Sequence, residues 1–536
     1  MKSIGTQKHL SNIMLTLVLS ISSSQLLSAA TDYNGNLIGK NKVIFNNNSS
    51  NSYIQSLTSH TINFDGLLDQ PFGNNSVGPL GTTFVPAVIA TGSTSDICYS
   101  IAIQSDGKIV MGGVSNNRFA AARFLPNGQL DVSFGGPAAG YSSQAGTMFI
   151  ATFIAGGTHD ECKSVAIQPD GKIVMGGYSN VHFAAARLLS NGALDTSFGG
   201  LAAGYTSQSG TLFLPFIAGG TQDVCWSIAI QPDGKIVMGG YTSPTYAEFA
   251  AARLLPNGAL DTSFGNHTPT NGTMFIATNI TPGGTEDVCR SIALQANGNI
   301  VMGGWSHAGG GNWHFAAARL LSNGNLDSSF GGYNSQPGTM YIAPIAGGAE
   351  DKCNSIALQA DGKIVMGGYS VEGITYARFA AARLLLNGQL DSSFGGYNSQ
   401  AGTMYITPTI AGGILDLCYS IAIQLDGKIV MSGYSADGVA HSHFSAARLL
   451  LNGQLDSSFG NNTVGRPVGT MFITPTIAGG GTDDNCNAIA IQPDGKIAMG
   501  GYSGTTKLFA LARLINPMSL QAYQASYAGV GAGLYS

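Results

Sequence analysis

The sequence predicts an all-β protein made from one repeated unit, and three recurring blocks of residues are the reason. The blocks return in register along the 536-residue chain, about 64 residues apart. They are Cys-x-Ser-Ile-Ala-Ile-Gln with an Asp-Gly turn and Lys-Ile-Val-Met-Gly-Gly, then Phe-Ala-Ala-Ala-Arg, then Leu-Asp-x-x-Phe-Gly. Each block or a close variant occurs seven times. We therefore predict a seven-bladed β-propeller with four antiparallel strands per blade, because radial repetition protects the edges of short sheets.

Each copy of the repeat contains four segments with strand character. In copy 1 they cover residues 98–104, 108–113, 119–125 and 146–150. The first segment alternates small and large residues, as a strand buried on both faces can. Asp-Gly and Asn-Gly turns separate the segments, and glycine takes the positive φ that tight hairpins require. The copies are numbered by their cysteines: Cys98, Cys162, Cys225, Cys289, Cys353, Cys418 and Cys486.

The two ends of the repeat region predict how the ring closes. The region opens with a single segment, Leu68 to Phe84, equivalent to a fourth strand, and it ends on a third strand, Phe509 to Leu514. We expect the N-terminal strand to pair with the last blade and complete it. A parallel β-helix is the alternative architecture, but its coils are shorter and contain fewer hairpin turns.

The rest of the chain divides into three segments. Residues 1–30 have the features of a signal peptide: Lys2 and Lys8, an apolar core at Ile13–Ile21, and small residues at 28–30. Residues 31–62 form an Asn/Ser-rich spacer, 63–515 the propeller, and 516–536 a tail that fits neither a blade nor a sorting signal. We expect an exported protein, located outside the cell, on its surface or in the periplasm.

Composition narrows the classes of partner. Hydrophobic residues make up 44% of the chain, charged residues 10%, and there are 75 glycines. The formal net charge of −5 gives no basic footprint for nucleic acid. Beyond the N-terminus, no segment has the roughly 18 consecutive apolar residues of a membrane-spanning helix. We expect a monomer that binds no nucleic acid and has no transmembrane segment.

The three blocks also resemble a known family. The pattern S/A-I-A-I-Q-P-D-G-K-I-V, then F-A-A-A-R, then L-D-x-S-F-G, is similar to the bacterial delta-60 repeat, a domain of unknown function with a β-propeller fold. The resemblance covers about residues 63–515 and implies a propeller and a bacterial source. It implies no activity and no catalytic residues. Copy 4 departs from the pattern at 296–299, and copy 7 at 497–499.

Three repeated side chains have structural interpretations. The cysteines recur at positions that face-packed sheets hold about 10 Å apart, beyond the reach of a disulfide, so we expect buried thiols and no zinc site. An aspartate two positions before each cysteine either caps loop amides or forms a ring of carboxylates that attracts cations. The seven arginines of the second block need partners, and the Leu-Asp-x-x-Phe-Gly aspartate supplies one.

Residues that differ between copies are better candidates for a binding site. The residue after each cysteine is Tyr99, Lys163, Trp226, Arg290, Asn354, Tyr419 or Asn487. The loop between the second and third strands is longer in copies 3 to 6, and both features fall on one face of the disc. The predicted ligand-binding residues are Tyr99, Trp226, Tyr246, Arg290, Trp305, His307, Trp313, His314, Tyr376, Tyr419, His441 and His443.

These residues favour a binding or adhesion module over an enzyme. Aromatic side chains beside Arg, His and Asn suit a glycan or a protein partner. No catalytic motif, metal site or cofactor site stands out from the repeat, so we predict none. A carbohydrate-active lyase or hydrolase on the same scaffold is one alternative. A structural component of the cell envelope or surface is the other.

Overall fold

The computed structural model describes residues 15–21, 25–31 and 65–516, except 74, 140–142, 200–207, 266–270, 333–334, 374, 397–398, 439–440, 461–465, 480 and 482. Residues 1–65 and 66–536 form two separate units. In the first unit, β1 (Leu15–Ile21) and β2 (Gln25–Thr31) pair as an antiparallel hairpin. The predicted signal peptide is otherwise outside the described residues, as are the spacer and the tail from residue 517.

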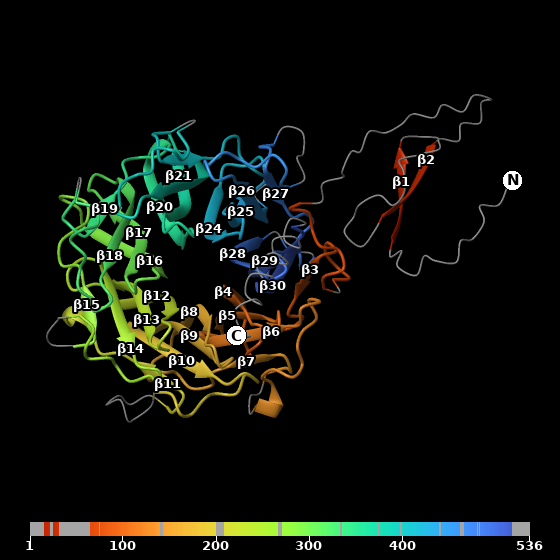
Figure 1. The fold of residues 1–536 in the computed structure, drawn as a ribbon. Helices are drawn as coiled ribbons and strands as arrows, with labels where there is room; N and C mark the ends of the chain where they lie inside the picture. The colour runs from red at the N-terminus through yellow and green to blue at the C-terminus, as the bar shows by residue number, and fades with distance from the viewer. Residues whose placement is uncertain are drawn as a thin grey trace, which may run out of the picture. The chain divides into compact units, whose positions relative to one another are not determined.

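The second unit is all-β, and the four strands of each copy form one antiparallel sheet, placed around a centre like the blades of a propeller (Figure 1). The strands are β4 (Asp96–Ile103), β5 (Ile109–Ser115), β6 (Arg118–Phe124) and β7 (Thr147–Phe149) in copy 1; β8 (Asp160–Ile167), β9 (Ile173–Ser179), β10 (His182–Leu188) and β11 (Thr211–Phe213) in copy 2; β12 (Asp223–Ile230), β13 (Ile236–Thr242), β14 (Glu248–Leu254) and β15 (Thr273–Phe275) in copy 3; β16 (Glu286–Leu294), β17 (Ile300–His307), β18 (Trp313–Leu320) and β19 (Thr339–Tyr341) in copy 4; β20 (Gly347–Leu358), β21 (Ile364–Glu372), β22 (Tyr376–Leu384) and β23 (Thr403–Tyr405) in copy 5; β24 (Asp416–Ile423), β25 (Ile429–Ala436), β26 (Ser442–Leu449) and β27 (Thr470–Phe472) in copy 6; and β28 (Asp484–Ile491), β29 (Ile497–Ser503) and β30 (Leu508–Leu514) in copy 7. The predicted strands of copy 1 all occur, although the fourth spans only three residues.

The last sheet takes its fourth strand from the start of the unit. β3 (Thr82–Phe84) pairs antiparallel with β30, with Thr82 opposite Ala512 and Phe84 opposite Ala510. In Figure 1 the orange β3 lies beside the blue β30. The pairing is the one that the order of the sequence blocks leads us to expect.

One pair of neighbouring sheets is joined at the loop end of its strands. The sheets of copies 4 and 5 form a continuous eight-stranded sheet, because β18 and β20 meet in a single parallel pair, Trp313 with Glu350. Isolated parallel bridges at the same end join copy 5 to copy 6 and copy 6 to copy 7. The longer loops of these copies therefore link one sheet to the next.

The hydrophobic core lies between sheets, and the Phe-Ala-Ala-Ala-Arg block explains how tightly they pack. Phe119 and Ala121 pack toward copy 2 with Cys162 and Val165. Ala120 lies on the opposite side of β6, in the core shared with copy 7. Alternation along a strand sends successive side chains to opposite faces, so each alanine leaves room for a neighbouring sheet.

The repeated arginine ties each sheet to the next. Arg123 Nε donates to Asp131 Oδ2 at 2.8 Å, and its Nη1 donates to the backbone oxygen of Ser190 in copy 2. The guanidinium also stacks on Phe134, 4.7 Å from its centroid. All seven arginines pair with the aspartate of the Leu-Asp-x-x-Phe-Gly block, as predicted from the sequence. The conserved-looking Arg, Asp and Phe of the repeat are therefore one structural unit.

The bonds that link successive sheets also link the last sheet to the first. Arg513 pairs with Asp69 of the N-terminal segment and donates to the backbone oxygen of Pro126 in copy 1. The amide of Gly73 donates to Asn127 O at 2.7 Å, as Gly135 does to Asn191 O between copies 1 and 2. The Asp96 amide donates to Lys507 O at 2.9 Å.

A double-mutant cycle on Arg513 and Asp69 tests this junction. The two residues are 444 positions apart in sequence, so only tertiary structure couples them. We expect a coupling free energy of unfolding of about 2 kcal/mol, since the pair is buried and hydrogen-bonded. Arg253 and Asp261, eight positions apart, provide the matched control cycle. Additive effects at 69 and 513, with coupling in the control, would contradict the pairing of β3 with β30.

Candidate functional site at the axial mouth

A β-bulge in the innermost strand of every copy sets the geometry of the site. Cys98 pairs with Gly113 and Ser100 with Gly112, which leaves Tyr99 unpaired between them. The same register shift occurs at the residue after the cysteine in all seven copies. A bulge adds one residue to a strand and re-aims its side chain. The seven bulge residues are Tyr99, Lys163, Trp226, Arg290, Asn354, Tyr419 and Asn487.

Glycine on the neighbouring strand makes the bulge possible. A Cβ on Gly113 would lie 1.9 Å from the carbonyl oxygen of Ile97, inside the backbone of the bulge. A Cβ on Gly112 would lie 2.2 Å from Val165 of the next copy. The Gly-Gly pair of the first block thus serves two contacts, one within the sheet and one between sheets.

The serine that follows the bulge connects neighbouring copies. Ser100 Oγ accepts the amide of Val165 at 3.1 Å, and five further copies repeat this bond. Copy 7 has Ala488 at the serine position. The bulge residues of adjacent copies are therefore held at one level around the centre.

Four consecutive bulge residues form an arc of alternating aromatic and cationic side chains. Lys163 Nζ lies 3.5 Å from the ring centroid of Tyr99 and 4.7 Å from that of Trp226. Arg290 Cζ lies 3.5 Å from the centroid of Trp226. Such contacts stabilise by about 0.5–2 kcal/mol each, more where water is excluded. We call Tyr99, Lys163, Trp226 and Arg290 the cationic arc.

The other bulge residues are different in character. Asn354 Nδ2 donates to Cys418 O at 2.9 Å, and Asn487 Nδ2 donates to Cys98 O at 2.7 Å. Each asparagine thus binds the backbone of the next copy's bulge, and Tyr419 lies between them in chain order. Although the backbone repeats, the mouth is asymmetric.

Arg290 stacks on Trp226 of the neighbouring copy. Its guanidinium interacts electrostatically with Tyr99, Tyr241, Tyr369 and Tyr419, which come from four other copies. Burial lowers the pKa of Arg290 from its ordinary value, and the tyrosines oppose this shift. These tyrosines belong to copies 1, 3, 5 and 6.

A second set of residues, which we call the second ring, lies next to the bulge residues. It consists of the cross-strand pairs formed by the residue before each cysteine, such as Ile97 with Val114. Its second-strand members are Val114, Tyr178, Tyr241, Trp305, Tyr369, Tyr434 and Tyr502. Glu161, opposite Tyr178, forms an ion pair with Lys163. Although burial opposes it, Lys163 lowers the pKa of Glu161. The second ring was not among the predicted site residues apart from Trp305.

The tryptophans of copy 4 extend this ring outward. Trp305 and Trp313 meet edge to face with centroids 4.7 Å apart, and His307 lies 4.3 Å from Trp313. Lys352 Nζ lies 5.2 Å from Trp305 and 4.7 Å from Trp313. Three predicted residues therefore form one cluster beside the mouth.

The remaining predicted residues divide between surface and interior. Tyr246 and Tyr376 are exposed, at 50% and 43% of their area, and His441 lies 3.3 Å from Asp437. His314 is buried and stacks on Tyr341, with centroids 5.5 Å apart. His443 is buried against Phe472 and hydrogen-bonds Ile473 O. Both buried histidines contact an aromatic ring of the outer strand of their own sheet.

The aspartates two positions before the cysteines are structural caps. Asp160 Oδ2 accepts the amide of Ile154 at 2.9 Å, and Asp160 Oδ1 accepts the hydroxyl of Ser179 at 2.5 Å. All seven are buried. Burial raises their pKa, to about 6 for Asp223, Asp287, Asp351, Asp416 and Asp484. They do not form the exposed carboxylate ring that was the other interpretation.

The cysteines are free and buried, which agrees with the structural interpretation. Burial raises the pKa of each thiol, to about 12 for Cys162, Cys289 and Cys486. Within the described part of the chain, no group of His, Cys, Asp and Glu side chains is arranged to hold a metal ion. No helix among the described residues is long and apolar enough to cross a membrane.

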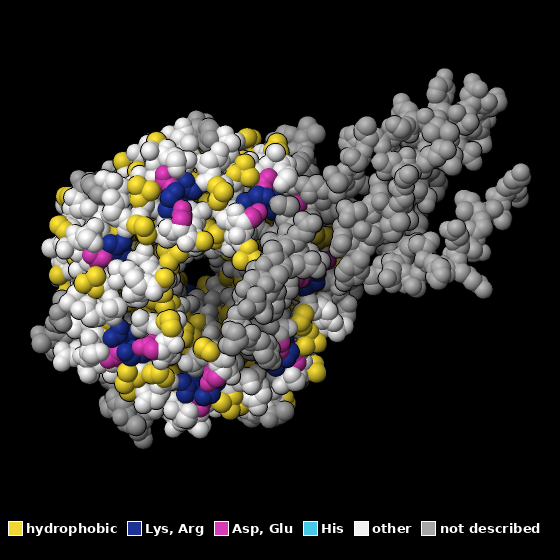
Figure 2. All heavy atoms as spheres, viewed as in Figure 1, with side chains coloured by type: hydrophobic (Ala, Val, Ile, Leu, Met, Phe, Trp, Pro, Cys, Tyr) yellow, Lys and Arg dark blue, Asp and Glu magenta, His cyan; other side chains and the backbone are white. Residues whose placement is uncertain are grey.

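The face shown in Figure 2 is opened at its centre and carries paired charges around the opening. Lys108 lies 2.8 Å from Asp106 and 4.0 Å from Asp131, and the other Asp-Gly-Lys turns repeat such pairs. These turns are at the far end of the inner strands from the caps. Charges here are neutralised pair by pair in six copies, and copy 4 has Asn297 and Asn299 at the same turn.

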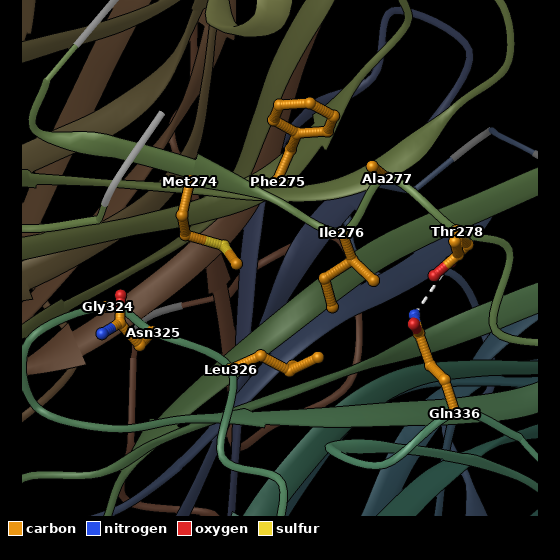
Figure 3. A pocket seen from close by; sticks show the side chains of 9 residues that line it. All are labelled: Met274, Phe275, Ile276, Ala277, Thr278, Gly324, Asn325, Leu326 and Gln336. Carbon is orange, nitrogen blue, oxygen red and sulfur yellow. Dashed lines mark hydrogen bonds between the residues drawn. The ribbon is translucent and has the colours of Figure 1, made fainter. Parts of the chain in front are cut away.

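A notch lies at the outer rim of the described part of the chain. It lies between Met274–Thr278, at the outer strand of copy 3, and Gly324–Leu326 of copy 4, with Gln336 donating to Thr278 O at 3.1 Å (Figure 3). An equivalent notch occurs at 404–407 and 453–455. Neither lining includes a titratable side chain other than Tyr405. The notches are products of the repeat and differ from the mouth in having no charged group.

Comparison with known families matches parts of six copies to one family model. Six segments match a family model described as "Domain of unknown function (DUF5122) beta-propeller": residues 104–134, 168–198, 231–264, 295–330, 359–394 and 424–459. Each begins near the first turn of a copy and ends at Leu-Asp-x-x-Phe-Gly. Copy 7 has no contiguous equivalent, since its Leu-Asp-x-x-Phe-Gly block is the N-terminal one. No curated protein matches the chain.

Several solved structures are similar at low identity. A catalytically inactive virginiamycin B lyase from Staphylococcus aureus, with quinupristin, is 11% identical over 81% of this chain and 99% of its own, with a TM-score of 0.39. Drosophila Semaphorin 1b is 10% identical over 83% and 87%, with a TM-score of 0.39. A protein of unknown function from Dyadobacter fermentans is 13% identical over 81% and 99%, with a TM-score of 0.37.

Adding a single methyl group to the glycine opposite the bulge should strongly lower the stability of the fold. Gly304→Ala would place a Cβ 1.9 Å from Val288 O, and we expect it to cost about 3 kcal/mol or more of stability. Thermal unfolding followed by circular dichroism measures the loss. Gly438→Ala is the matched control, because nothing lies within 4 Å of its Cβ position. Equal melting temperatures for the two variants would show that the bulge is not closely packed.

The capping aspartates predict that stability falls as pH rises from about 4 to 6. Burial raises the pKa of all seven in the folded state, to about 6 for Asp351 and Asp484, against about 4 in the unfolded chain, so the folded state binds more protons in this window. Below pH 4 the protein loses stability as pH falls, because the arginine-paired aspartates become protonated. Although burial opposes it, hydrogen bonds from a nearby serine and the charge of the arginine lower their pKa, to about 2 for Asp391 and Asp456. We expect a maximum melting temperature near pH 4–5.

Asp351→Asn should reduce the loss of stability between pH 4 and 6, because the asparagine side chain has no proton to lose. The asparagine oxygen can still accept the backbone N–H of Ile345. The exposed turn variant Asp361→Asn is the control and should keep the full decline. Melting temperatures between pH 4 and 8 provide the measurement. A wild-type melting temperature that rises steadily from pH 4 to 7 would contradict the assignment.

Proposed function

We propose that this chain is a binding module whose ligand occupies the axial mouth, and that the mouth is formed by a closed ring of seven blades of the delta-60 type. The strand pairing of β3 with β30 and the Arg513 contacts support closure. Seven repeats of one sheet support the blade number. The bound ligand is a glycan or a protein segment, and the protein acts after export.

One observation carries the proposal: within the inner strands, the copies are nearly the same except at the bulge and beside it. The bulge gives each copy one residue with no pairing partner in its own sheet, and these residues differ in size, charge and hydrogen-bonding capacity. The variation is concentrated at the centre, where the side chains of several copies meet. A repeat kept only for stability needs no such asymmetry.

An enzyme on this scaffold is the second candidate. Its support is the charge at the mouth, where Glu161 and Lys163 lie in contact. However, the neighbouring lysine lowers the pKa of Glu161, which favours the ionised form and opposes a role as general acid. The free cysteines are buried protonated thiols and offer no nucleophile. A binding function therefore explains the residues of the mouth without requiring a general acid or a nucleophile.

Screening the full chain against oligosaccharides and peptides tests the proposal. We expect at least one class to raise the melting temperature, since a ligand of the folded state stabilises it. Trp226→Ala with Tyr419→Ala should weaken that binding at least tenfold. Tyr246→Ala with Tyr376→Ala, at exposed rim positions, is the control and should bind normally.

The opposite result, loss of binding in the rim variant alone, would place the site elsewhere on the face. Release of new reducing ends from a bound glycan would support the enzyme instead. No response to any ligand in the panel would favour a structural role.

A further inference from the structure

We infer that the ligand of the axial mouth is an acidic sugar, whose carboxylate is bound by the guanidinium of Arg290. The inference rests on the proposed binding function and adds the chemical class of the ligand. It depends on the charge balance of the mouth, on the orientation of one guanidinium, and on the aromatic side chains around it.

The cationic side chains of the mouth differ in whether an acidic side chain neutralises them. Lys163 is paired with Glu161. Lys352 lies 2.8 Å from Glu350, whose carboxylate also accepts the hydroxyl of Tyr369 at 2.6 Å. Among the described residues, Arg290 forms no ion pair, although Glu286 lies on the same strand. Arg290 is half-buried, and a partly desolvated cation without a counter-ion gains when a ligand supplies the charge.

The position of the guanidinium leaves its hydrogen-bonding edge available. Its face is used by Trp226, at 3.5 Å from the ring centroid. The five N–H donors of arginine lie in the plane of the group, so stacking does not consume them. A planar carboxylate matches this edge with two parallel hydrogen bonds. Stacking also fixes the guanidinium before the ligand arrives, which reduces the entropy lost on binding.

The groups around Arg290 also favour an oxygen-rich ligand. The indole Nε1 of Trp226 is buried, and no described residue accepts a hydrogen bond from it. Tyr99 packs against Lys163, which also contacts Trp226, so a phenol group lies beside this indole. Aromatic faces and hydroxyl groups are the usual partners of a sugar ring, and an unpaired arginine selects one that carries a carboxylate.

The test compares one acid with its neutral derivative. Trigalacturonic acid, its methyl ester and inorganic phosphate are titrated calorimetrically into the full chain. We expect the acid to bind at least tenfold more tightly than the ester, and phosphate alone to bind far more weakly than either. Phosphate that binds as tightly as the acid would identify a simple anion site and overturn the sugar assignment.

Variants of Arg290 decide whether this residue is responsible. Arg290→Gln should weaken the acid at least tenfold and leave the ester unchanged, whereas Arg290→Lys should recover only part of the loss because it lacks the planar edge. Lys235→Gln removes one positive charge at the far turns and is the matched control. Melting temperatures near that of wild type establish that each variant is folded.

The outcomes separate the two proposals. Equal binding of acid and ester, both lost in Trp226→Ala with Tyr419→Ala, would overturn the acidic class and leave the mouth as the binding site. Acid binding that survives Arg290→Gln would overturn the assignment to Arg290. Absence of binding by any uronic acid probe would overturn the inference. The proposed binding function would then still be tested by the oligosaccharide and peptide screen.

Discussion

The contact between the second glycine of each Gly-Gly pair and the β-bulge opposite it is the constraint on which the mouth depends. Any residue other than glycine would place its Cβ against a carbonyl oxygen of the bulge. In copies 1 to 4 the distance from the Cβ position to that oxygen is 1.9 Å. Because the bulge is present in every copy, one residue per sheet is released from pairing at the same level. The central surface then varies without any change in the sheets that support it.

Stability and recognition are consequently assigned to different residues of the repeat. The Arg–Asp–Phe unit, the capping aspartates and the serine bonds hold each sheet to the next. These residues are the same, or nearly so, in all copies. The bulge residues make few contacts that the scaffold needs, and in copies 1 to 4 they form the cationic arc. A change at the bulge therefore alters the central surface at small cost in folding.

The sequence was sufficient for the strands, the four-stranded sheets and the arginine pairs, because period-2 alternation and the turn residues are local signals. The site was only partly predictable. The variable residue after each cysteine could be recognised, but its convergence on the axis depends on a bulge that has no signal of its own beyond the opposing glycines. Tyr178, Tyr241 and Tyr369 were missed for this reason. His314 and His443, also among the predicted residues, are buried, and alternation with the neighbouring Trp313 predicts that His314 faces the other side of its strand.

The most direct test of this account uses an exchange that the chain itself suggests. Asparagine already occupies the bulge in copies 5 and 7, where it donates to the next copy's backbone. A variant with asparagine at Tyr99, Lys163, Trp226, Arg290 and Tyr419 should fold with a melting temperature within a few degrees of wild type and lose all ligand binding. Unfolding of this variant would show that the bulge side chains hold the ring together. Unchanged binding by a folded variant would show that the mouth is not the site.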